Sequence, residues 1–404
     1  MATPEPEASQ GPDLPSVDEI RQRTFACFGR RPCLWQCECA LAQLRANEDI
    51  VCISGTGSGK TLCFWMPLLF RPDGIQIVIT PLNILGGQNR SQLERLGIPA
   101  VAISSETATP ENYQAIAASA FRVVIVSPEL AFKSDGGFSR LWRNAPFVSK
   151  IISVVWDEAH CISSWSSFRP DYGDAGRLRA ILPKHVAYLL PSATLPRHVL
   201  DDVIKKLQLR RDRIRTLQRS NDRPNVYITV QKIAHSLTSF KDLDFLVPDN
   251  WEPGTRIPRF LVFFDNIEES VKAANVLHRR VPPAYRKNIV WFNSDNTPEF
   301  REYTTTGFQN HHLYGLYCTD AFGMGVDIPD VEVVVQWRVS CDMNSLWQRF
   351  GRAARGPGTK AVAILFAESK FFDEDRAEAA KRAEKRKRAA EKAIVDKEVN
   401  KRRR

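Results

Sequence analysis

Short apolar segments recur along this chain in two successive series, and each is followed by a stretch with the pattern of a helix. Nearly continuous runs of β-branched and other apolar residues are typical of strands that are buried on both faces of a parallel sheet. The first series is 49–54, 75–80, 122–127, 152–157 and 186–194, and the second is 259–265, 288–293, 314–318, 331–337 and 360–366. The sequence therefore predicts two α/β lobes, at 17–215 and 216–366.

The segments outside these strand series are polar. Residues 1–16 are rich in Pro, Glu and Ser, which predicts a disordered leader. Residues 210–258 are polar and contain proline, as expected of a linker and the start of the second lobe. Residues 367–404 hold 14 Lys and Arg against 9 Asp and Glu. This basic tail is either a solvated helix or disordered segment, or a nuclear-targeting or nucleic-acid-binding tail.

Charge and cysteine usage restrict the class of protein. A formal net charge of +10 favours polyanionic partners. No run approaches the ~18 apolar residues that a membrane helix needs, and the first residues lack the apolar core of a signal peptide. Nine cysteines are present without a CxxC pair, and the spacing of Cys27, Cys33, Cys37 and Cys39 matches no common zinc module. We therefore predict a reduced intracellular protein, located in the nucleus and without a membrane partner.

A glycine-rich loop follows the first predicted strand. Its glycines allow backbone N–H groups to approach phosphates, and the helix that follows adds its dipole. Lys60 is predicted to neutralise the β- and γ-phosphates of ATP, and Thr61 to hold Mg²⁺. Ser54 stands where the strict phosphate-loop pattern has glycine. The predicted nucleotide-binding residues are Gly55, Thr56, Gly57, Ser58, Gly59, Lys60 and Thr61.

Two adjacent carboxylates end another predicted strand of the first lobe. Asp157 follows the apolar run at 152–156, and a carboxylate at the carboxyl end of a strand beside a phosphate loop is suited to bind magnesium. Glu158 is predicted to orient and deprotonate the attacking water as a general base. An Asp-Glu pair in an arbitrary loop would be a solvated surface, but the strand and the phosphate loop together favour the functional interpretation.

The second lobe contributes the arginine-rich segment Gln348-Arg349-Phe350-Gly351-Arg352-Ala353-Ala354-Arg355-Gly356. Arginines three residues apart lie on one helical face or turn, and their guanidinium groups can stabilise charge on a transferring γ-phosphoryl group. We expect Arg352 and Arg355 to reach across an ATP cleft between the lobes. Without a phosphate-loop lobe the same segment would be an ordinary basic turn.

Several motifs together resemble the RecQ-type DNA helicases of superfamily two, over roughly residues 25–366. The most specific is the segment from Asp157 to Trp165, which continues to Tyr172 and resembles the family's DEAHCIS motif with its aromatic-rich loop. The segment 222–225 resembles the family's DRPN sequence between the lobes. Further matches are Thr80-Pro81-Leu82, Val126-Ser127-Pro128-Glu129, Ser192-Ala193-Thr194, Ala321-Phe322-Gly323-Met324-Gly325-Val326-Asp327 and Gln348 to Arg355.

The resemblance implies roles for these positions. Two RecA-like lobes are implied, with Gln36 reading the adenine edge, Asp327 in the nucleotide site, and Gln348, Arg352 and Arg355 in catalysis. The residues implied in DNA binding and in its coupling to hydrolysis are Thr80, Pro81, Ser127, Glu129, His160, Trp165, Phe168, Arg169, Ser192 and Thr194. Trp165 and Phe168 also offer faces for base stacking, worth about 1–3 kcal/mol each, although the same aromatics could pack the lobe.

The chain departs from the family pattern in ways that bear on function. The loop from Trp165 to Phe168 lacks the family's histidine and is one residue shorter, which puts the efficiency of coupling in question. Ala354 replaces the glycine between the two arginines, a change that a helix tolerates well. No segment after Phe366 resembles the RecQ zinc-binding segment, so we expect weak separation of a full duplex.

These observations predict an ATP-dependent 3′–5′ DNA helicase or single-stranded DNA translocase. Its expected cofactors are ATP and Mg²⁺, and its expected partners are single-stranded DNA and junctions of single strand with duplex. The polarity comes only from the resemblance. Two alternatives remain open, namely an RNA helicase of the DEAD/DEAH type and a nucleic-acid-binding remnant whose motor has decayed.

Overall fold

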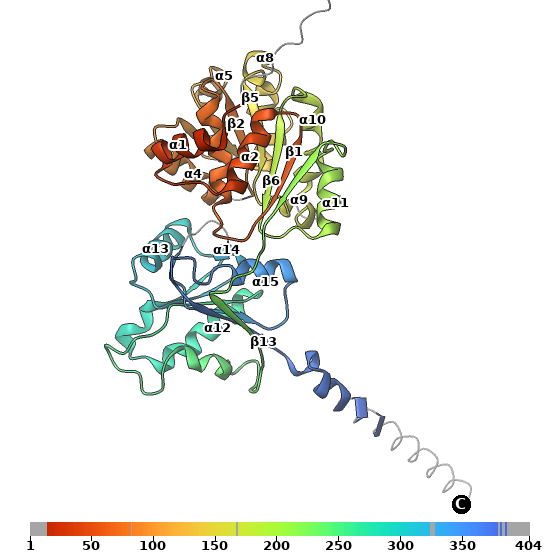
Figure 1. Cartoon of the computed structure of the whole chain (residues 1–404). Coiled ribbons are helices and arrows are strands. Elements are labelled where there is room, and N and C mark those ends of the chain that lie inside the picture. Colours follow the sequence, from red (N-terminus) through yellow and green to blue (C-terminus); the bar gives the residue numbers. More distant parts are fainter. Residues whose placement is uncertain are drawn as a thin grey trace, which may run out of the picture. The chain divides into compact units, whose positions relative to one another are not determined.

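The computed structural model describes residues 14–81, 83–166, 169–323, 328–378, 380–381 and 384–385. The chain divides into two compact units, which we name lobe 1 (Met1–Asp222) and lobe 2 (Arg223–Arg404). Each lobe is a sheet with helices packed on both of its faces (Figure 1). The predictions for Phe168 and Asp327, for most of the leader and for the outer part of the tail lie outside the described residues.

Lobe 1 is built on a seven-stranded sheet in the order β3-β4-β2-β5-β6-β1-β7, with all strand pairs parallel. Its central strands are buried along their whole length because helices cover both sides. The predicted α/β class is confirmed. The strands are β1 (Asp49–Ile53), β2 (Ile75–Ile79), β3 (Ala100–Ile103), β4 (Val123–Val126), β5 (Ile151–Trp156), β6 (Ala187–Ser192) and β7 (Ile214–Gln218).

The two faces of this sheet carry different helices. On one face Val78 and Val155 pack under α1 (Val17–Phe28), α2 (Leu34–Arg45), α3 (Lys60–Trp65), η1 (Met66–Phe70) and α4 (Asn83–Arg95). On the other, Ile77, Val154 and Trp156 pack under the remaining helices, as the alternation of side chains along a strand requires. These are α5 (Pro110–Ala117), α6 (Pro128–Phe132), α7 (Gly137–Leu141), α8 (Ala145–Val148), α9 (Cys161–Ser164), η2 (Pro170–Asp174), α10 (Arg177–Ile181) and α11 (Arg197–Lys206).

Lobe 2 repeats this plan with a six-stranded parallel sheet in the order β10-β11-β9-β12-β13-β8. The strands are β8 (Val226–Lys232), β9 (Phe260–Phe263), β10 (Ile289–Phe292), β11 (Gly315–Cys318), β12 (Val333–Trp337) and β13 (Ala361–Ala367). One face packs against η3 (Lys241–Leu246), α12 (Ile267–Leu277) and η5 (Pro283–Asn288), and the other against α13 (Pro298–Gln309), α14 (Asp320–Gly323) and α15 (Met343–Phe350). Two short turns, η4 (His278–Arg280) and η6 (Ser369–Phe371), complete the lobe.

The boundary between the lobes lies at Asp222–Arg223, not at 215–216 as the sequence suggested. The reason is β7, which runs through the expected boundary and pairs with β1 of the first sheet. The segment expected to be a linker also contains β8, which pairs with β13. Both are edge strands whose side chains, except for the buried Val226, are half-exposed or exposed, so neither shows the continuous apolar pattern of a central strand.

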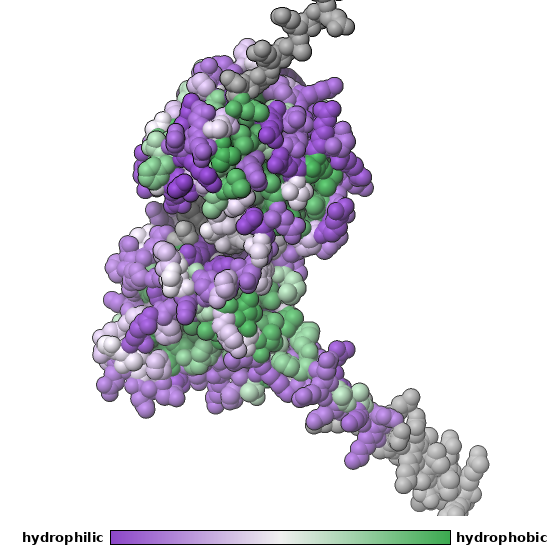
Figure 2. Space-filling view, viewed as in Figure 1, coloured by the Kyte–Doolittle hydropathy of each residue, from purple (hydrophilic) through white to green (hydrophobic). Residues whose placement is uncertain are grey.

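The surface and the tail are polar. The face of each lobe seen in Figure 2 is mostly hydrophilic, with smaller hydrophobic areas. Residues 373–378 of the tail are helical, and Lys232 of β8 forms an ion pair with Asp375. Across the residues that the structure describes, no helix combines the length and the apolar character that a membrane crossing requires.

Candidate functional site

The predicted functional residues of lobe 1 follow the carboxyl ends of neighbouring parallel strands. All strands of a parallel sheet end at the same edge, so these residues are brought to one side of the lobe. In sheet order they are Ser127 after β4, Thr80 after β2, Asp157 after β5, Ser192 at the end of β6 and the phosphate loop after β1. Asp157 therefore lies between Ser127 and Thr80 on one side and Ser192 and the phosphate loop on the other.

The loop after β1 has the backbone of a phosphate-binding loop. Gly57 and Gly59 have φ values of 79° and 81°, in the left-handed region where a side chain is strained. Lys60, the first residue of α3, directs its Nζ to the carbonyl oxygens of Ser54 at 2.7 Å and Gly55 at 3.1 Å. Ser58 Oγ is buried and has no hydrogen-bond partner among the described residues. A cation and an unsatisfied hydroxyl at a helix start are groups that fit a polyphosphate.

Gln36 connects α2 to this loop. Its Oε1 accepts a hydrogen bond from the Cys33 backbone N–H at 2.8 Å, and its Nε2 donates to the Gly59 carbonyl at 3.0 Å. A Cβ on Gly59 would lie only 2.8 Å from this amide, so a side chain there would displace Gln36 in addition to straining the backbone. The structure thus places Gln36 against the phosphate loop, while its contact with adenine stays a prediction.

Asp157 and Glu158 follow β5 as the sequence predicted. Burial and the neighbouring Glu158 carboxylate raise the pKa of Asp157 to about 7, although the Lys60 ammonium group lowers it. A carboxylate with this pKa is one that a bound cation would hold in its charged form. Together with the Thr61 hydroxyl at the start of α3, the donor set fits Mg²⁺, which prefers oxygen ligands.

Glu158 has the geometry of a strained functional residue. Its φ of 48° lies in the left-handed region, which costs a residue with a side chain about 1–2 kcal/mol. Its Oε2 is buried without a hydrogen-bond partner among the described residues, and His160 Nδ1 lies 3.5 Å away, an ion pair when the imidazole is protonated. An unsatisfied carboxylate oxygen next to the predicted metal ligand can accept a proton from water.

His160 links the carboxylates to the predicted coupling motif on β6. Its Nδ1 lies 3.0 Å from Ser192 Oγ, and Ser192 Oγ donates to the Thr194 carbonyl at 2.7 Å. Ser192 Oγ also accepts from the Thr194 backbone N–H at 3.3 Å. The structure therefore joins three predicted coupling residues into one hydrogen-bonded chain beside Glu158.

Arg169 joins the predicted DNA-binding segments. Its Nη1 donates to the Pro81 carbonyl at 2.8 Å and lies 3.4 Å from a Glu129 carboxylate oxygen. Its guanidinium carbon is 4.8 Å from the centre of the Trp165 ring, a cation–π contact. Residues predicted from three separate motifs thus meet at one arginine.

The aromatic loop is held by α11, which the sequence analysis assigned no role. Lys206 Nζ donates to Ser166 Oγ at 2.7 Å, to the Ile162 carbonyl at 3.3 Å and to Asp202 at 2.6 Å. Asp202 also accepts from Ser163 Oγ at 2.6 Å. The two serines therefore tie the loop to an Asp–Lys pair, four residues apart on the helix. No sequence signal separated this pair from an ordinary surface ion pair.

Substituting Lys206 by methionine is expected to release the loop and weaken coupling. Methionine keeps the length of the aliphatic stem but removes charge-assisted hydrogen bonds, each worth about 1.5–3 kcal/mol. The ratio of DNA-stimulated to basal ATPase should fall about tenfold, which corresponds to about 1.4 kcal/mol. Basal turnover should stay the same, because no phosphate-loop residue contacts Lys206 in these bonds. Lys205→Met, on the exposed side of α11, is the control, and equal ratios for both variants would contradict the role of the loop anchor.

Asn221 is a second residue that the sequence analysis missed. Its Nδ2 donates to the Ala193 carbonyl at 2.9 Å, within the coupling motif. Its Oδ1 is buried without a hydrogen-bond partner among the described residues and would lie 3.7 Å from a Cβ on Gly55. Asn221 therefore packs between the coupling motif and the phosphate loop at the end of lobe 1.

In lobe 2 the predicted residues Arg352 and Arg355 lie in a turn that is held by hydrogen bonds, not in a helix. The helix α15 contains Gln348 and ends at Phe350, before Arg352 and Arg355. Ala354 N–H donates to the Val331 carbonyl at 2.9 Å, and Arg355 Nε donates to the Gly351 carbonyl at 3.0 Å.

The segment 222–225, which resembles the DRPN sequence of RecQ helicases, donates hydrogen bonds to this turn. Arg223 Nη2 donates to the carbonyls of Ala353 and Ala354 at 2.7 and 2.9 Å. Asn225 Nδ2 donates to the Ala354 carbonyl at 2.8 Å and to the Thr359 carbonyl at 3.1 Å. The DRPN resemblance thus corresponds, within lobe 2, to a scaffold for the arginine-bearing turn.

The prediction that Ala354 replaces the family's glycine within a helix was wrong. Ala354 lies outside the helix and has a φ of 43°, in the left-handed region where glycine is favoured. Its side chain is buried in the core of lobe 2.

We expect Ala354→Gly to be nearly neutral for stability and Ala353→Gly to be costly. Glycine at 354 relieves about 1–2 kcal/mol of backbone strain. This offsets the loss of one buried methyl group, about 0.8 kcal/mol, and the added freedom of the unfolded chain, about 0.4–1 kcal/mol. At Ala353 φ is not positive. Glycine there would lose the buried methyl group and add freedom to the unfolded chain without relieving strain. The two variants should differ by about 1–2 kcal/mol in denaturant unfolding, and equal stabilities would refute the argument from strain.

Arg349, between the predicted residues, is a buried arginine that binds two partly exposed carboxylates. Its guanidinium group donates to both carboxylate oxygens of Asp320 at 2.8 Å, to Asp265 at 2.6 Å and to the Gln336 side chain. The side chain is almost fully buried at the centre of lobe 2, and these carboxylates raise its pKa although burial lowers it. This arginine stabilises the lobe and was not distinguished by its sequence context.

Two family models match the chain. The DEAD/DEAH box helicase model matches residues 36–203, and the helicase conserved C-terminal domain model matches residues 240–357. The first match lies within lobe 1 and the second within lobe 2, in agreement with the division of the structure.

Similar proteins and structures agree with these models. The chain is 30% identical over 318 residues to the ATP-dependent DNA helicase Q1 of Rattus norvegicus, covering 77% of this chain and 49% of that protein. It is 28% identical to the ATP-dependent DNA helicase RecQ of Bacillus subtilis, covering 80% of this chain and 51% of that protein. The Mycobacterium smegmatis helicase Lhr bound to single-stranded DNA and AMP-PNP has a TM-score of 0.64 at 18% identity, covering 88% of this chain and 48% of that chain. The S. cerevisiae Dbp5 bound to RNA and ADP BeF3 has a TM-score of 0.61 at 21% identity, covering 87% and 89%.

The chain spans about half the length of the curated relatives named above. The structural likenesses, all at low identity, support the fold of two RecA-like lobes. The motifs, the two family models and these relatives lead to one conclusion: the chain contains a superfamily-two helicase core of the RecQ type.

Proposed function

We propose that this protein is an ATP-dependent 3′–5′ DNA helicase or single-stranded DNA translocase. The observation that carries the proposal is the segment from Asp157 to Arg169, which begins at the predicted metal ligand and ends at the arginine that contacts Pro81 and Glu129. A change at the nucleotide can therefore reach the predicted DNA-binding residues within one short stretch of chain. The 3′–5′ polarity rests on the resemblance to RecQ helicases.

In this proposal each residue of the nucleotide site has a defined task. Lys60 neutralises the phosphates, Thr61 and Asp157 hold Mg²⁺, and Glu158 orients and deprotonates the attacking water. Bound Mg²⁺ supplies charge neutralisation at the phosphate oxygens. Gln348, Arg352 and Arg355 stabilise charge on the γ-phosphoryl group, and the proposal requires lobe 2 to bring them there during the cycle.

The coupling residues transmit the state of the nucleotide. His160 contacts both Glu158 and Ser192, so a change in the hydrogen bonding of Glu158 alters the Ser192–Thr194 turn. Arg169 and Trp165 offer a cation and an aromatic face to a single strand. Their tie to α11 through Ser166 and Lys206 fixes where that surface lies.

The decisive experiment measures ATP hydrolysis with and without nucleic acid. Turnover should be stimulated by single-stranded DNA and more weakly by RNA of the same length and sequence. A duplex with a 3′ single-stranded tail should be unwound in preference to one with a 5′ tail. ATP hydrolysis that is indifferent to DNA would contradict the motor.

Two alternatives make different predictions in the same assay. An RNA helicase is favoured by the likeness to the RNA-bound Dbp5 structure, and it predicts stronger stimulation by RNA. A remnant with a decayed motor predicts DNA binding without stimulated turnover above that of a Lys60→Ala variant.

We also propose junctions of single strand with duplex as the preferred substrate and the nucleus as the location. The basic tail, with 14 Lys and Arg against 9 Asp and Glu over 367–404, supports a nuclear-targeting role. A fluorescent fusion whose nuclear accumulation survives replacement of the tail's Lys and Arg by Gln would contradict this assignment.

A further inference from the structure

A cavity of about 320 Å³ lies in lobe 1 at the amino-terminal ends of the strands. It is lined by residues that precede or begin β1, β2, β5 and β6, among them Arg45, Arg71, Ile152 and His185. The nucleotide residues lie at the opposite edge of the same sheet. Strands of five to six residues at about 3.3 Å per residue separate the two sites by roughly 16–20 Å. The cavity is therefore distinct from the phosphate loop.

Two buried polar groups line the inner part of the cavity. Gln43 is 3% exposed, and its Nε2 donates to the Cys63 carbonyl at 2.8 Å. Its Oε1 is buried and has no hydrogen-bond partner among the described residues. Ser153 is 1% exposed and accepts a hydrogen bond from Gln76 Nε2 at 2.7 Å, which leaves its own hydroxyl hydrogen to donate. A buried acceptor without a donor costs about 1–3 kcal/mol, which a bound donor would recover.

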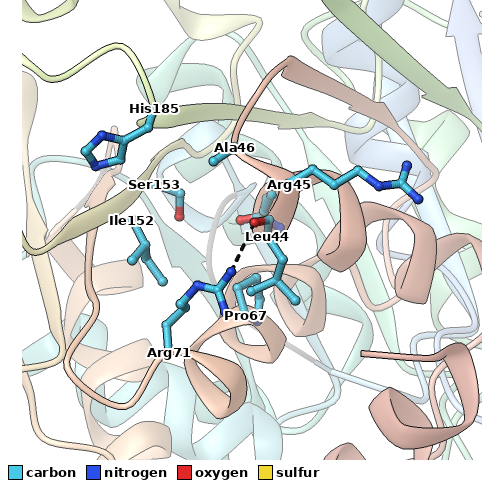
Figure 3. A pocket seen from close by; sticks show the side chains of 9 residues that line it. Leu44, Arg45, Ala46, Pro67, Arg71, Ile152, Ser153 and His185 are labelled. Carbon is cyan, nitrogen blue, oxygen red and sulfur yellow. Dashed lines mark hydrogen bonds between the residues drawn. The ribbon is translucent and has the colours of Figure 1, made fainter. Parts of the chain in front are cut away.

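Basic side chains surround the cavity, and none of its lining residues is acidic. Arg71 is half-buried and donates to the carbonyls of Phe70 and Leu44 at 3.1 and 3.3 Å, which leaves other N–H groups of its guanidinium available. Arg45 and His185 are exposed. Figure 3 shows Arg71 turned toward Leu44, whereas Arg45 extends away from the other labelled side chains. The ionisable side chains that line the cavity are therefore all basic, which favours an anion as its occupant.

The remaining wall is apolar. Leu44, Pro67 and the side chain of Ile152 line it together with the Cβ of Ala46. The volume is at the lower end of the range for small-molecule sites, about 300–1,000 Å³. An apolar wall with a few convergent polar groups suits a small ring or branched chain.

We propose that this cavity binds a small organic anion with an apolar body and one hydrogen-bond donor. The anionic group lies toward Arg71, Arg45 and His185, and the donor reaches Gln43 Oε1. Nucleic acid is a poorer occupant, because the cavity holds only about 320 Å³ and part of its lining is apolar. Binding at this cavity does not require the motor function proposed above.

The test measures direct binding to the full chain. The probes are para-hydroxybenzoate, phenyl phosphate and the neutral analogue para-hydroxybenzamide, titrated by calorimetry with AMP-PNP and Mg²⁺ at saturation so that the phosphate loop is occupied. The site variant is Arg45→Gln with His185→Gln, and the matched control is Arg143→Gln with His198→Gln, all four side chains being exposed. A second variant, Ile152→Trp, fills the cavity.

At least one anionic probe should bind saturably and about tenfold more tightly than the neutral amide, as expected when charge-assisted contacts are made. The site variant should weaken its binding about tenfold, the control pair should leave it unchanged, and Ile152→Trp should abolish it. The better anion then identifies carboxylate or phosphate as the preferred group. The proposal would be overturned if the amide bound as tightly as the anions, or if the site variant and the control pair bound the probe equally. It would also be overturned if neither anion bound saturably, or if a single-stranded oligonucleotide displaced the probe.

Discussion

Replacing Glu158 by glutamine is expected to lower DNA-stimulated ATP hydrolysis by about 10²–10⁴-fold, the range that a positioned general base contributes. Glutamine keeps the size of the side chain but cannot take a proton from water. The left-handed backbone at Glu158 holds its carboxylate beside Asp157, with Oε2 lacking a hydrogen-bond partner among the described residues. The measurement is the steady-state rate at saturating single-stranded DNA, together with nucleotide affinity from a fluorescent ATP analogue. Affinity should change little, because Lys60 and the loop remain.

The controls separate a catalytic role from a structural one. Glu94→Gln, on an exposed turn of α4, should retain the wild-type rate. Arg355→Ala, in lobe 2, should also lose stimulated turnover, because an arginine that stabilises the γ-phosphoryl group is worth about 10³-fold or more. If Glu158→Gln hydrolysed ATP at the wild-type rate, another group would have to activate the water.

Replacing Arg349 by methionine is expected to destabilise lobe 2 by about 3–5 kcal/mol, the cost of removing one partner from a buried ion pair. Methionine fills much of the volume but leaves Asp265 and Asp320 without their shared cation. Asp320 is 57% exposed, which places the expected cost at the lower end. For a lobe of this size the melting temperature should fall by roughly 6–12 °C. The control is Lys272→Met, whose partner Glu268 lies on the surface of α12 and whose loss should cost less than about 1 kcal/mol. An unchanged melting temperature in Arg349→Met would rule out a stabilising role.

The effect of Arg349→Met should shrink as pH falls. In the wild type, burial alone would raise the pKa of Asp265, but hydrogen bonds from Arg349 and Ser340 hold it below its usual value. The stability that this carboxylate contributes is present above its unfolded pKa of about 3.9 and is lost as pH falls below it. In the variant the lowering contact with Arg349 is gone, so burial disfavours the charged carboxylate and protonation becomes stabilising. Denaturant unfolding at pH 7 and at pH 4.5 should therefore show a smaller difference between the two proteins at the lower pH.

The central strands and the nucleotide site could be predicted because each has a local signature. Val51, Val78 and Val155 lie in strands buried on both sides, so their segments are mostly apolar, with one buried polar or charged residue in each. The phosphate loop is one contiguous segment of the sequence, and so is the Asp157-Glu158 pair. Each follows a strand, and a parallel sheet brings the ends of its strands to one edge. Edge strands such as β7 and β8 lack this signature, because most of their side chains are partly or fully exposed.

Residues that support the site from a distance could not be predicted. Lys206 has the sequence context of an ordinary i, i+4 ion pair with Asp202, and only the fold brings Ser163 and Ser166 to it. Arg349 looks like another basic residue of the arginine-rich segment until Asp265 and Asp320 meet it from other elements. Ala354 was predicted to be helical. Its left-handed backbone angle could not be predicted, because the turn is held by hydrogen bonds with Arg223 and Val331, which are far away in sequence.

The helix α2 contacts the phosphate loop through Gln36 and lines the cavity of lobe 1 through Gln43. Gln36 fastens its first turn to Gly59, and Gln43 fastens its last turn to Cys63 of α3. Both attachments go to the segment from Gly59 to Cys63, so a shift of Gln43 at the end of α2 is transmitted to α3 and the phosphate loop. If a molecule held at Gln43 changes how tightly ATP binds, thermodynamic linkage requires ATP to change the retention of that molecule by the same factor.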